Sequence, residues 1–142
     1  MNRKSFGIIL SLVTAAVFVG AGCSLKFSTV KYKDDQQNAI AGTKKLHDMF
    51  NDGMYDAIYE MADDRAKQTK SKDALIAVFT RLQSERGRIL DADLTDAKVE
   101  PRAAYREVHL TFHTRFENGE SKEDIVWYVS SEKAAFFTLS FE

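Results

Sequence analysis

The fold is decided by residues 108–129, which read VHLTFHTRFENGESKEDIVWYV. Apolar and polar residues alternate up to Phe116, a pattern typical of a strand that is covered on one face. Asn118-Gly119 follows, and this dipeptide is the strongest sequence signal for a two-residue type I′ hairpin turn. Such a turn brings three apolar pairs onto one face: Phe112 with Ile125, Leu110 with Trp127, and Val108 with Val129. A slip of one residue would turn half of these side chains toward water, so the pattern predicts a long hairpin with one buried face.

Three segments before the hairpin have apolar residues at helical spacing: residues 36–51, 55–62 and 71–86. We expect Asp34 or Asp35 to cap the first helix, and Ser71 to cap the third. Gly87 is expected to end the third helix. The polar residues 63–70 are expected to form a loop or irregular turn.

Two further segments read as strands. Residues 89–99 form a weak strand, and Pro101 marks the break before the hairpin. The last strand is expected to place four residues on one side: Ala135, Phe137, Leu139 and Phe141. Helices followed by strands predict an α+β fold, with N-terminal helices packed on one face of a curved four-stranded antiparallel sheet.

Two stretches carry a resemblance to a known superfamily: FNDGMYDAIY at residues 50–59, and FENG at residues 116–119 with Glu123 after it. Together with the order of elements, they resemble the cone-shaped domains of the nuclear transport factor 2-like superfamily. More narrowly, the chain looks like the small bacterial lipoproteins of unknown function that carry this cone. The resemblance covers about residues 36–142 and implies a cone-shaped domain, with a cystatin-like topology as the nearby alternative.

The first 22 residues have the composition of an export signal. Arg3 and Lys4 form a short basic start, and Phe6 to Val19 is mostly apolar. This run is shorter than the about 20 residues of a membrane span. We therefore expect a removable signal peptide over residues 1–22.

The signal ends in Gly20-Ala21-Gly22-Cys23, which resembles the lipobox of bacterial lipoproteins. In that family the cysteine receives a diacylglycerol, the signal is cut before the cysteine, and the new amine is usually acylated, which gives stable membrane anchoring. Ser24 resembles the residue found in lipoproteins that are passed to the outer membrane. The other interpretation is an incidental thiol, but Cys23 is the only cysteine and an exposed free thiol is a liability in an oxidising compartment. We expect a lipidated tether over residues 23–35, a domain over residues 36–142, and a location in the envelope, at the outer membrane and facing the periplasm.

The composition excludes one class of partner. The chain has 20 Lys and Arg, two of them in the signal, against 21 Asp and Glu, so the remainder is slightly acidic. A protein that binds nucleic acid is expected to carry a strongly basic face. We therefore expect no nucleic-acid partner.

The inner face of the hairpin reads as core and not as a catalytic cavity. The one acid on that face is Glu123, which the predicted register puts opposite Thr114, near the open end of the hairpin. It could be a polar group at a ligand mouth, but we favour a rim carboxylate that meets Lys122, Arg115 or backbone amides. Tyr55 and Tyr59 are the other candidates for the ligand mouth, although tyrosines at such positions more often serve packing.

The histidines do not predict a metal site. His109 and His113 share a strand face, but four residues separate them by roughly 13 Å, too far for one zinc ion. We expect them in exposed cross-strand pairs, His109 with Tyr128 and His113 with Asp124. His47 lies beside the apolar stripe of the first helix and is expected at the core boundary. No cofactor or metal is predicted, because none of the phosphate-binding or catalytic motifs is present.

The sequence therefore favours a non-enzymatic, lipid-anchored envelope protein that binds a protein partner or a small apolar ligand. One alternative is a hydrolase or isomerase of the cone fold. Another is an immunity or accessory lipoprotein for a periplasmic toxin or secretion system. A homodimer through the outer sheet face is a further hypothesis, with four residues on that face: Thr111, Val126, Tyr128 and Phe136.

Overall fold

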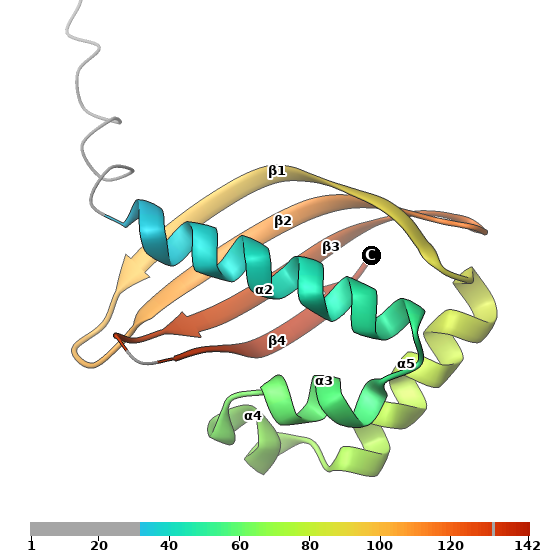
Figure 1. Ribbon diagram of the computed structural model, residues 1–142, viewed down its shortest axis with the longest axis horizontal. Coiled ribbons are helices and arrows are strands. Elements are labelled where there is room, and N and C mark those ends of the chain that lie inside the picture. The colour runs from blue at the N-terminus through green and yellow to red at the C-terminus, as the bar shows by residue number, and fades with distance from the viewer. Residues whose placement is uncertain (1–31, 132) are drawn as a thin grey trace, which may run out of the picture.

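The computed structural model describes residues 32–131 and 133–142. In this part of the chain four helices precede four strands (Figure 1). The helices are α2 (Lys33–Asn51), α3 (Tyr55–Met61), α4 (Asp64–Thr69) and α5 (Lys72–Arg86). The strands are β1 (Ile89–Pro101), β2 (Arg106–Phe116), β3 (Gly119–Val129) and β4 (Ala134–Phe141). The expected signal peptide and Cys23 lie outside the described residues, and within those residues no helix is long and apolar enough to cross a membrane.

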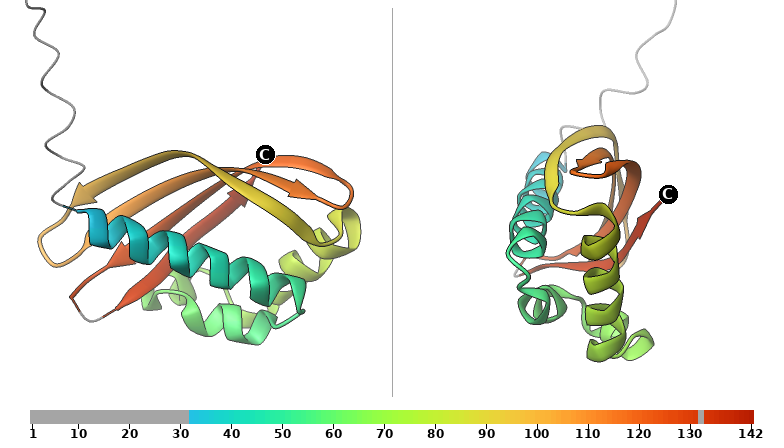
Figure 2. Two further views of the ribbon diagram at one scale, coloured as in Figure 1. Left: turned by 45° about the horizontal axis from the view of Figure 1, so that its top comes forward. Right: turned by 90° about the vertical axis from the view of Figure 1, so that its right-hand side faces the viewer.

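The strands form one antiparallel sheet in the order β1-β2-β3-β4, so each strand pairs with its neighbour in sequence. The sheet is curved, and α2 lies along one of its faces (Figure 2). The shorter helices α3 and α4 lie beyond the β4 edge, and α5 leads from there along one end of the sheet to the start of β1 (Figures 1 and 2). The predicted α+β fold, with helices on one face of a four-stranded antiparallel sheet, is confirmed.

The register predicted for the hairpin is wrong by two residues. Gly119 pairs with Phe116, so the turn residues are Glu117 and Asn118. A type I′ turn needs positive φ at both turn residues, but of the residues 116–119 only Gly119 has one, at 104°. The pairs become Val108 with Trp127, Leu110 with Ile125, and Phe112 with Glu123. Because side chains alternate with a period of two, this shift leaves the predicted buried face unchanged.

A tertiary contact holds this turn. The backbone N–H of Glu117 donates to the carbonyl of Arg88, and that of Asn118 donates to the carbonyl of Arg86, both at 2.9 Å. The turn is therefore docked on the connection between α5 and β1. The local preference of Asn118-Gly119 gives way to this contact, which the sequence of the hairpin cannot reveal.

A bulge in β4 changes which aromatic side chains face the core. Phe137 is an extra residue opposite the step from Val126 to Trp127 of β3. Phe136 consequently packs against Trp127 in the core, while Phe137 stacks on Tyr128 at the outer face. The predictions that placed Ala135 and Phe137 on the inner side and Phe136 on the outer face are therefore wrong, since Ala135 lies opposite Tyr128 of the outer face.

Two details of the helices also differ from the sequence prediction. α2 begins at Lys33 instead of Gln36 and has no side-chain cap. Asp34 and Asp35 therefore lie inside its first turn, and the carboxylate of Asp35 pairs with Arg106 of β2 at 2.6 Å. Residues 63–70 are not a loop, since they contain the short helix α4.

The ends of α4 and α5 follow the capping rules. Asp63 caps α4 by accepting a hydrogen bond from the N–H of Arg65 at 3.0 Å. The predicted Ser71 cap of α5 and its end at Gly87, where φ is 76°, are confirmed.

The closest approach of α2 to the sheet is at Gly42. A Cβ atom on Gly42 would lie 2.5 to 2.9 Å from three atoms of the Trp127 indole ring. The next residue, Thr43, accepts a hydrogen bond from Trp127 Nε1 at 2.9 Å, and Trp127 is only 1% exposed. The missing side chain at position 42 therefore allows the helix to lie directly on the indole ring.

This contact predicts that Gly42→Ala destabilises the protein, although alanine in a helix is normally about 1 kcal/mol better than glycine. The rigid, buried indole ring cannot move away, and overpacking of this kind costs about 1–3 kcal/mol. We expect a net loss of about 1 kcal/mol in the free energy of unfolding, measured by urea denaturation. Ala41→Gly, at the exposed neighbouring position, measures the helix-propensity contribution alone. A Gly42→Ala protein more stable than the native chain would contradict the close approach.

Candidate functional site

A carboxylate lies in the centre of the core. Glu123 of β3 has no exposed surface. Nε2 of His47, on α2, lies 2.9 Å from both of its carboxylate oxygens. The hydroxyl of Thr114, on β2, donates to Oε2 of Glu123 at 2.6 Å. These three side chains form one buried polar network.

These positions correct two predictions. Glu123 was expected at the rim beside Lys122 or Arg115, but it lies in the core opposite Phe112. His47 was expected at the core boundary, and it is only 8% exposed and bonded to Glu123. No local spacing could reveal this bond, since it joins residues 76 positions apart.

The network has no contact with either of the two cavities described below. Neither cavity is lined by Glu123, His47 or Thr114. The His47 ring packs edge-on against Phe112, with the ring centres 6.0 Å apart. Acid-base catalysis needs a group within hydrogen-bond reach of a substrate. The arrangement therefore suits a structural role, which is to hold α2 on β2 and β3.

A cavity of about 150 Å³ lies between β4 and the three short helices. Its walls are mostly apolar. The lining comes from α3 and the residue after it (Tyr59, Ala62), from α4 and its C-cap (Ala66, Lys67, Thr69, Lys70), from α5 (Leu75, Val78, Phe79) and from β4 (Phe136, Phe137, Thr138, Leu139, Phe141). An apolar cavity of about this volume can hold a benzene-sized group.

Of the three residues expected at a ligand mouth, only Tyr59 lines this cavity. The hydroxyl of Tyr55 donates instead to the side-chain carbonyl of Gln83, and its ring stacks on Phe79. Burial raises the pKa of Tyr55, as expected for a phenol held within a packed cluster. Glu123 lies away from the cavity lining. The sequence therefore identified one cavity residue and missed the aromatic wall from β4.

Two lysines contribute positive charge to the cavity lining. Lys67 donates to the carbonyl of Glu60 at 3.2 Å and pairs with the carboxylate of Glu60 at 3.5 Å. Lys70 has no ion-pair partner among the residues that the structure describes. An acidic group on a ligand would find its countercharge there.

A second cavity of about 230 Å³ lies on the outer side of the sheet. The guanidinium of Arg65, on α4, lies over the rings of Tyr105 and Tyr128, 4.3 and 4.0 Å from their centres. Nε of Arg65 also donates to Asp63 at 2.8 Å. Burial alone would raise the pKa of Asp63, but these hydrogen bonds from Arg65 lower it. Arg65 is thus a fixed cation that joins α4 to the outer face of the sheet.

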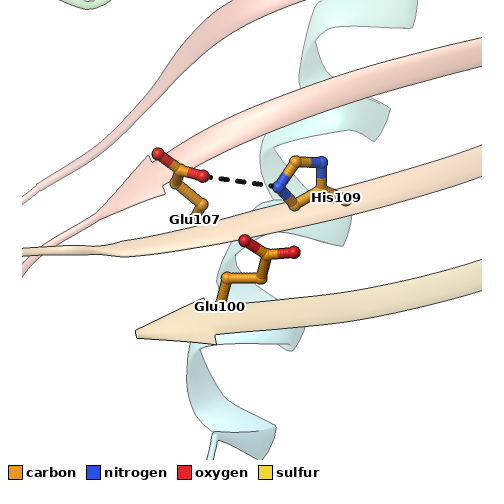
Figure 3. Close-up of side chains that lie close together, drawn as sticks. All are labelled: Glu100, Glu107 and His109. Carbon is orange, nitrogen blue, oxygen red and sulfur yellow. Dashed lines mark ion pairs between the residues drawn. The ribbon is translucent and has the colours of Figure 1, made fainter. Parts of the chain in front are cut away.

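Three potential metal ligands lie close together on β1 and β2: Glu100, Glu107 and His109 (Figure 3). Arg102 already bridges the two carboxylates, at 2.8 Å from Glu100 and 2.6 Å from Glu107, and Lys98 pairs with Glu100 at 2.5 Å. The hydrogen bond from Arg102 lowers the pKa of Glu107. A metal ion would have to displace these cations, so we interpret the cluster as an ion-pair network.

The expected partners of the strand histidines are also corrected. His109 lies opposite Val126 instead of Tyr128, and its Nε2 is 3.5 Å from Glu107. His113 lies opposite Lys122 instead of Asp124, and it pairs with Glu120 at 3.1 Å. Both errors follow from the two-residue shift of the hairpin.

No protein-family model matches this chain, and no curated protein matches it either. The resemblance to the nuclear transport factor 2-like superfamily therefore stays a prediction from the sequence.

The buried network predicts a large stability loss in Glu123→Ala. The change leaves His47 and Thr114 without their shared partner, and breaking a buried polar pair in this way costs about 3–5 kcal/mol. Glu120→Ala is the matched control, because Glu120 lies on β3 like Glu123 and pairs with a histidine, His113 of β2, but is exposed. We expect Glu120→Ala to change the free energy of unfolding by less than about 1 kcal/mol. Equal losses in the two variants, measured by urea denaturation, would contradict the structural role of Glu123.

Proposed function

We propose that this chain is a lipid-anchored envelope protein whose non-enzymatic domain binds an apolar group in the cavity between β4 and α3–α5. The observation that carries the proposal is the cavity itself, with its wall of aromatic and aliphatic side chains. Ligand sites are typically concave and mostly apolar, with a few polar groups that fix orientation. Lys70 and Thr69 supply such polar groups at the lining.

The volume limits what can enter. Pockets for drug-sized molecules measure about 300–1,000 Å³, so a cavity of about 150 Å³ accepts less. A single ring, a short acyl chain or one large apolar side chain matches this size. Binding is favoured over the isomerase or hydrolase alternative because the buried acid and histidine do not line the cavity.

The anchor supports a role at the membrane surface. Lipidation of Cys23 would hold the domain within the reach of a short tether, so that its ligand or partner is met close to the bilayer. This part of the proposal depends on the sequence of residues 1–23 alone.

The cavity is tested with toluene as a probe. We expect toluene to raise the melting temperature of the native protein, since a ligand that binds only the folded state stabilises it. Val78→Trp should abolish this rise, because Val78 is 53% exposed and lines the cavity, so that an indole there would fill the opening. Ala77→Trp is the control, on the exposed face of the same helix and outside the lining. An unchanged toluene effect in Val78→Trp would show that the probe binds elsewhere.

The anchor is tested with Cys23→Ser expressed in a bacterial host. We expect this variant to lose its acyl groups in mass spectrometry and to leave the membrane fraction. Ser24→Ala keeps the thiol and should remain acylated and membrane-bound. Retention of unacylated Cys23→Ser in the membrane would refute lipidation as the means of anchoring.

A further inference from the structure

We propose that the open edge of β4, residues 138–141, binds an extended segment of another polypeptide as a fifth strand, with an apolar side chain in the cavity and a carboxylate at Lys70. This inference rests on the proposed function of the cavity and names the class of its partner. Three observations support it. The backbone of β4 has hydrogen-bonding groups that are unpaired among the described residues, the β4 edge lacks the protection found at the β1 edge, and the positively charged Lys70 lines the cavity.

The two edges of the sheet differ in their protection against strand pairing. Proteins usually protect edge strands with charges, bulges and proline. β1 has all three: charged residues at five positions, two register shifts and Pro101 at its end. β4 reads AAFFTLSF and has neither a charged residue nor a proline, and its bulge at Phe137 precedes the free residues 138–141. Only β4 therefore presents an edge that another strand could join.

The free backbone groups on this edge can be assigned from the register. Glu142 exchanges both backbone hydrogen bonds with Lys122, at 2.9 and 3.1 Å. Such pairs alternate along an antiparallel ladder, so the N–H and C=O groups of Leu139 and Phe141 point away from β3. Among the described residues, no further element pairs with these groups. They offer two donors and two acceptors to an added strand.

The beginning of the β4 edge already forms backbone contacts within the domain. The N–H of Asp63 donates to the carbonyl of Phe136 at 2.8 Å, and Ala62 forms a parallel bridge with Phe136. The connection between α3 and α4 therefore occupies the edge at Phe136. The free part begins beyond this contact, next to the cavity.

An added strand would lie beside the cavity. Strands in a sheet are about 4.8 Å apart, and Leu139 and Phe141 belong to both the free edge and the cavity lining. Inward side chains of the added strand would point between β4 and α5, where Val78 is exposed. The cavity volume of about 150 Å³ suits one such side chain.

The positive charge of Lys70 predicts that the bound segment carries an acidic residue. Lys70 lines the cavity without an ion-pair partner in the described residues, whereas Lys67 is already paired with Glu60. A segment with a carboxylate next to its apolar residue would complement this charge.

A second copy of this chain does not suit the site. Two β4 edges would pair antiparallel about a two-fold axis perpendicular to the sheet, which puts both helical layers on the same side. A second copy would thus bring its own short helices into the layer that the short helices of the first copy already occupy beside β4 (Figure 1). A flexible extended segment meets no such obstacle.

The test is selection from a random peptide library on the full chain, held in detergent micelles. We expect enriched peptides to combine a large apolar residue with an acidic residue and to protect the N–H groups of Leu139 and Phe141 from hydrogen exchange. Thr138→Lys places a charge on the exposed edge and should weaken binding about tenfold or more. Leu90→Lys, at an exposed position of β1, should leave the affinity unchanged. Lys70→Glu should change the preference of the selection from acidic to basic residues.

Three results would overturn the proposal: enriched peptides that bind Thr138→Lys as well as the native chain, an absence of enriched peptides, or a dimer of the chain paired through β4. The toluene experiment distinguishes a wrong strand partner from a cavity that binds no ligand at all. If toluene binds in the cavity and no peptide joins β4, only the strand partner is refuted. If toluene also fails to bind, the cavity itself is not a binding site.

Discussion

The hydrogen bonds between His47 and Glu123 are the contact on which the arrangement of the domain depends. Apolar contacts are non-directional, so they would tolerate a helix shifted along the sheet. A buried carboxylate is satisfied in few positions, and its loss of hydration costs several kcal/mol when it lacks a partner. The bond therefore fixes α2 on β3 at one position, and the hydrogen bond from Trp127 to Thr43 does so one turn earlier along the helix. We infer that the network specifies which packing is adopted, while the apolar core provides most of the stability.

The cavity follows from how α4 is held. Arg65 reaches the outer face of the sheet and stacks on Tyr105 and Tyr128, while Ala66 and Lys67 of the same helix line the cavity. The bulge at Phe137 contributes from the other side, because Phe137 stacks on Tyr128 and also lines the cavity. A helix as short as α4 would be marginal in water by itself. These contacts fix it at the edge of β4, so the cavity lies between anchored walls.

The parts of the fold that follow from local periodicity could be predicted, and the parts that depend on distant contacts could not. Alternation identified the buried face of the hairpin even though the turn was misplaced, because a shift of two residues preserves the face. It failed in β4, where the bulge at Phe137 reverses the faces within the strand. α4 was missed because its sequence is polar and because Arg65 contacts residues distant in the sequence, Tyr128 of β3 and Tyr105 just before β2. The bond between His47 and Glu123 has no local signature, so the one acid correctly placed on the inner face was assigned to the rim.

The location of the buried acid also bears on the choice between binding and catalysis. Buried ionisable groups often mark functional sites, so a carboxylate with a histidine in the core raises the question of an active site. Catalysis requires that such groups meet a substrate, and here each faces the other within a packed core, with Thr114 occupying a further hydrogen-bonding position. The apolar cavity lies elsewhere, between β4 and the short helices. Its polar side chains are two lysines, two threonines and Tyr59, and no carboxylate is among its described lining residues. The separation of the buried acid from the cavity is therefore the physical argument for a binding domain.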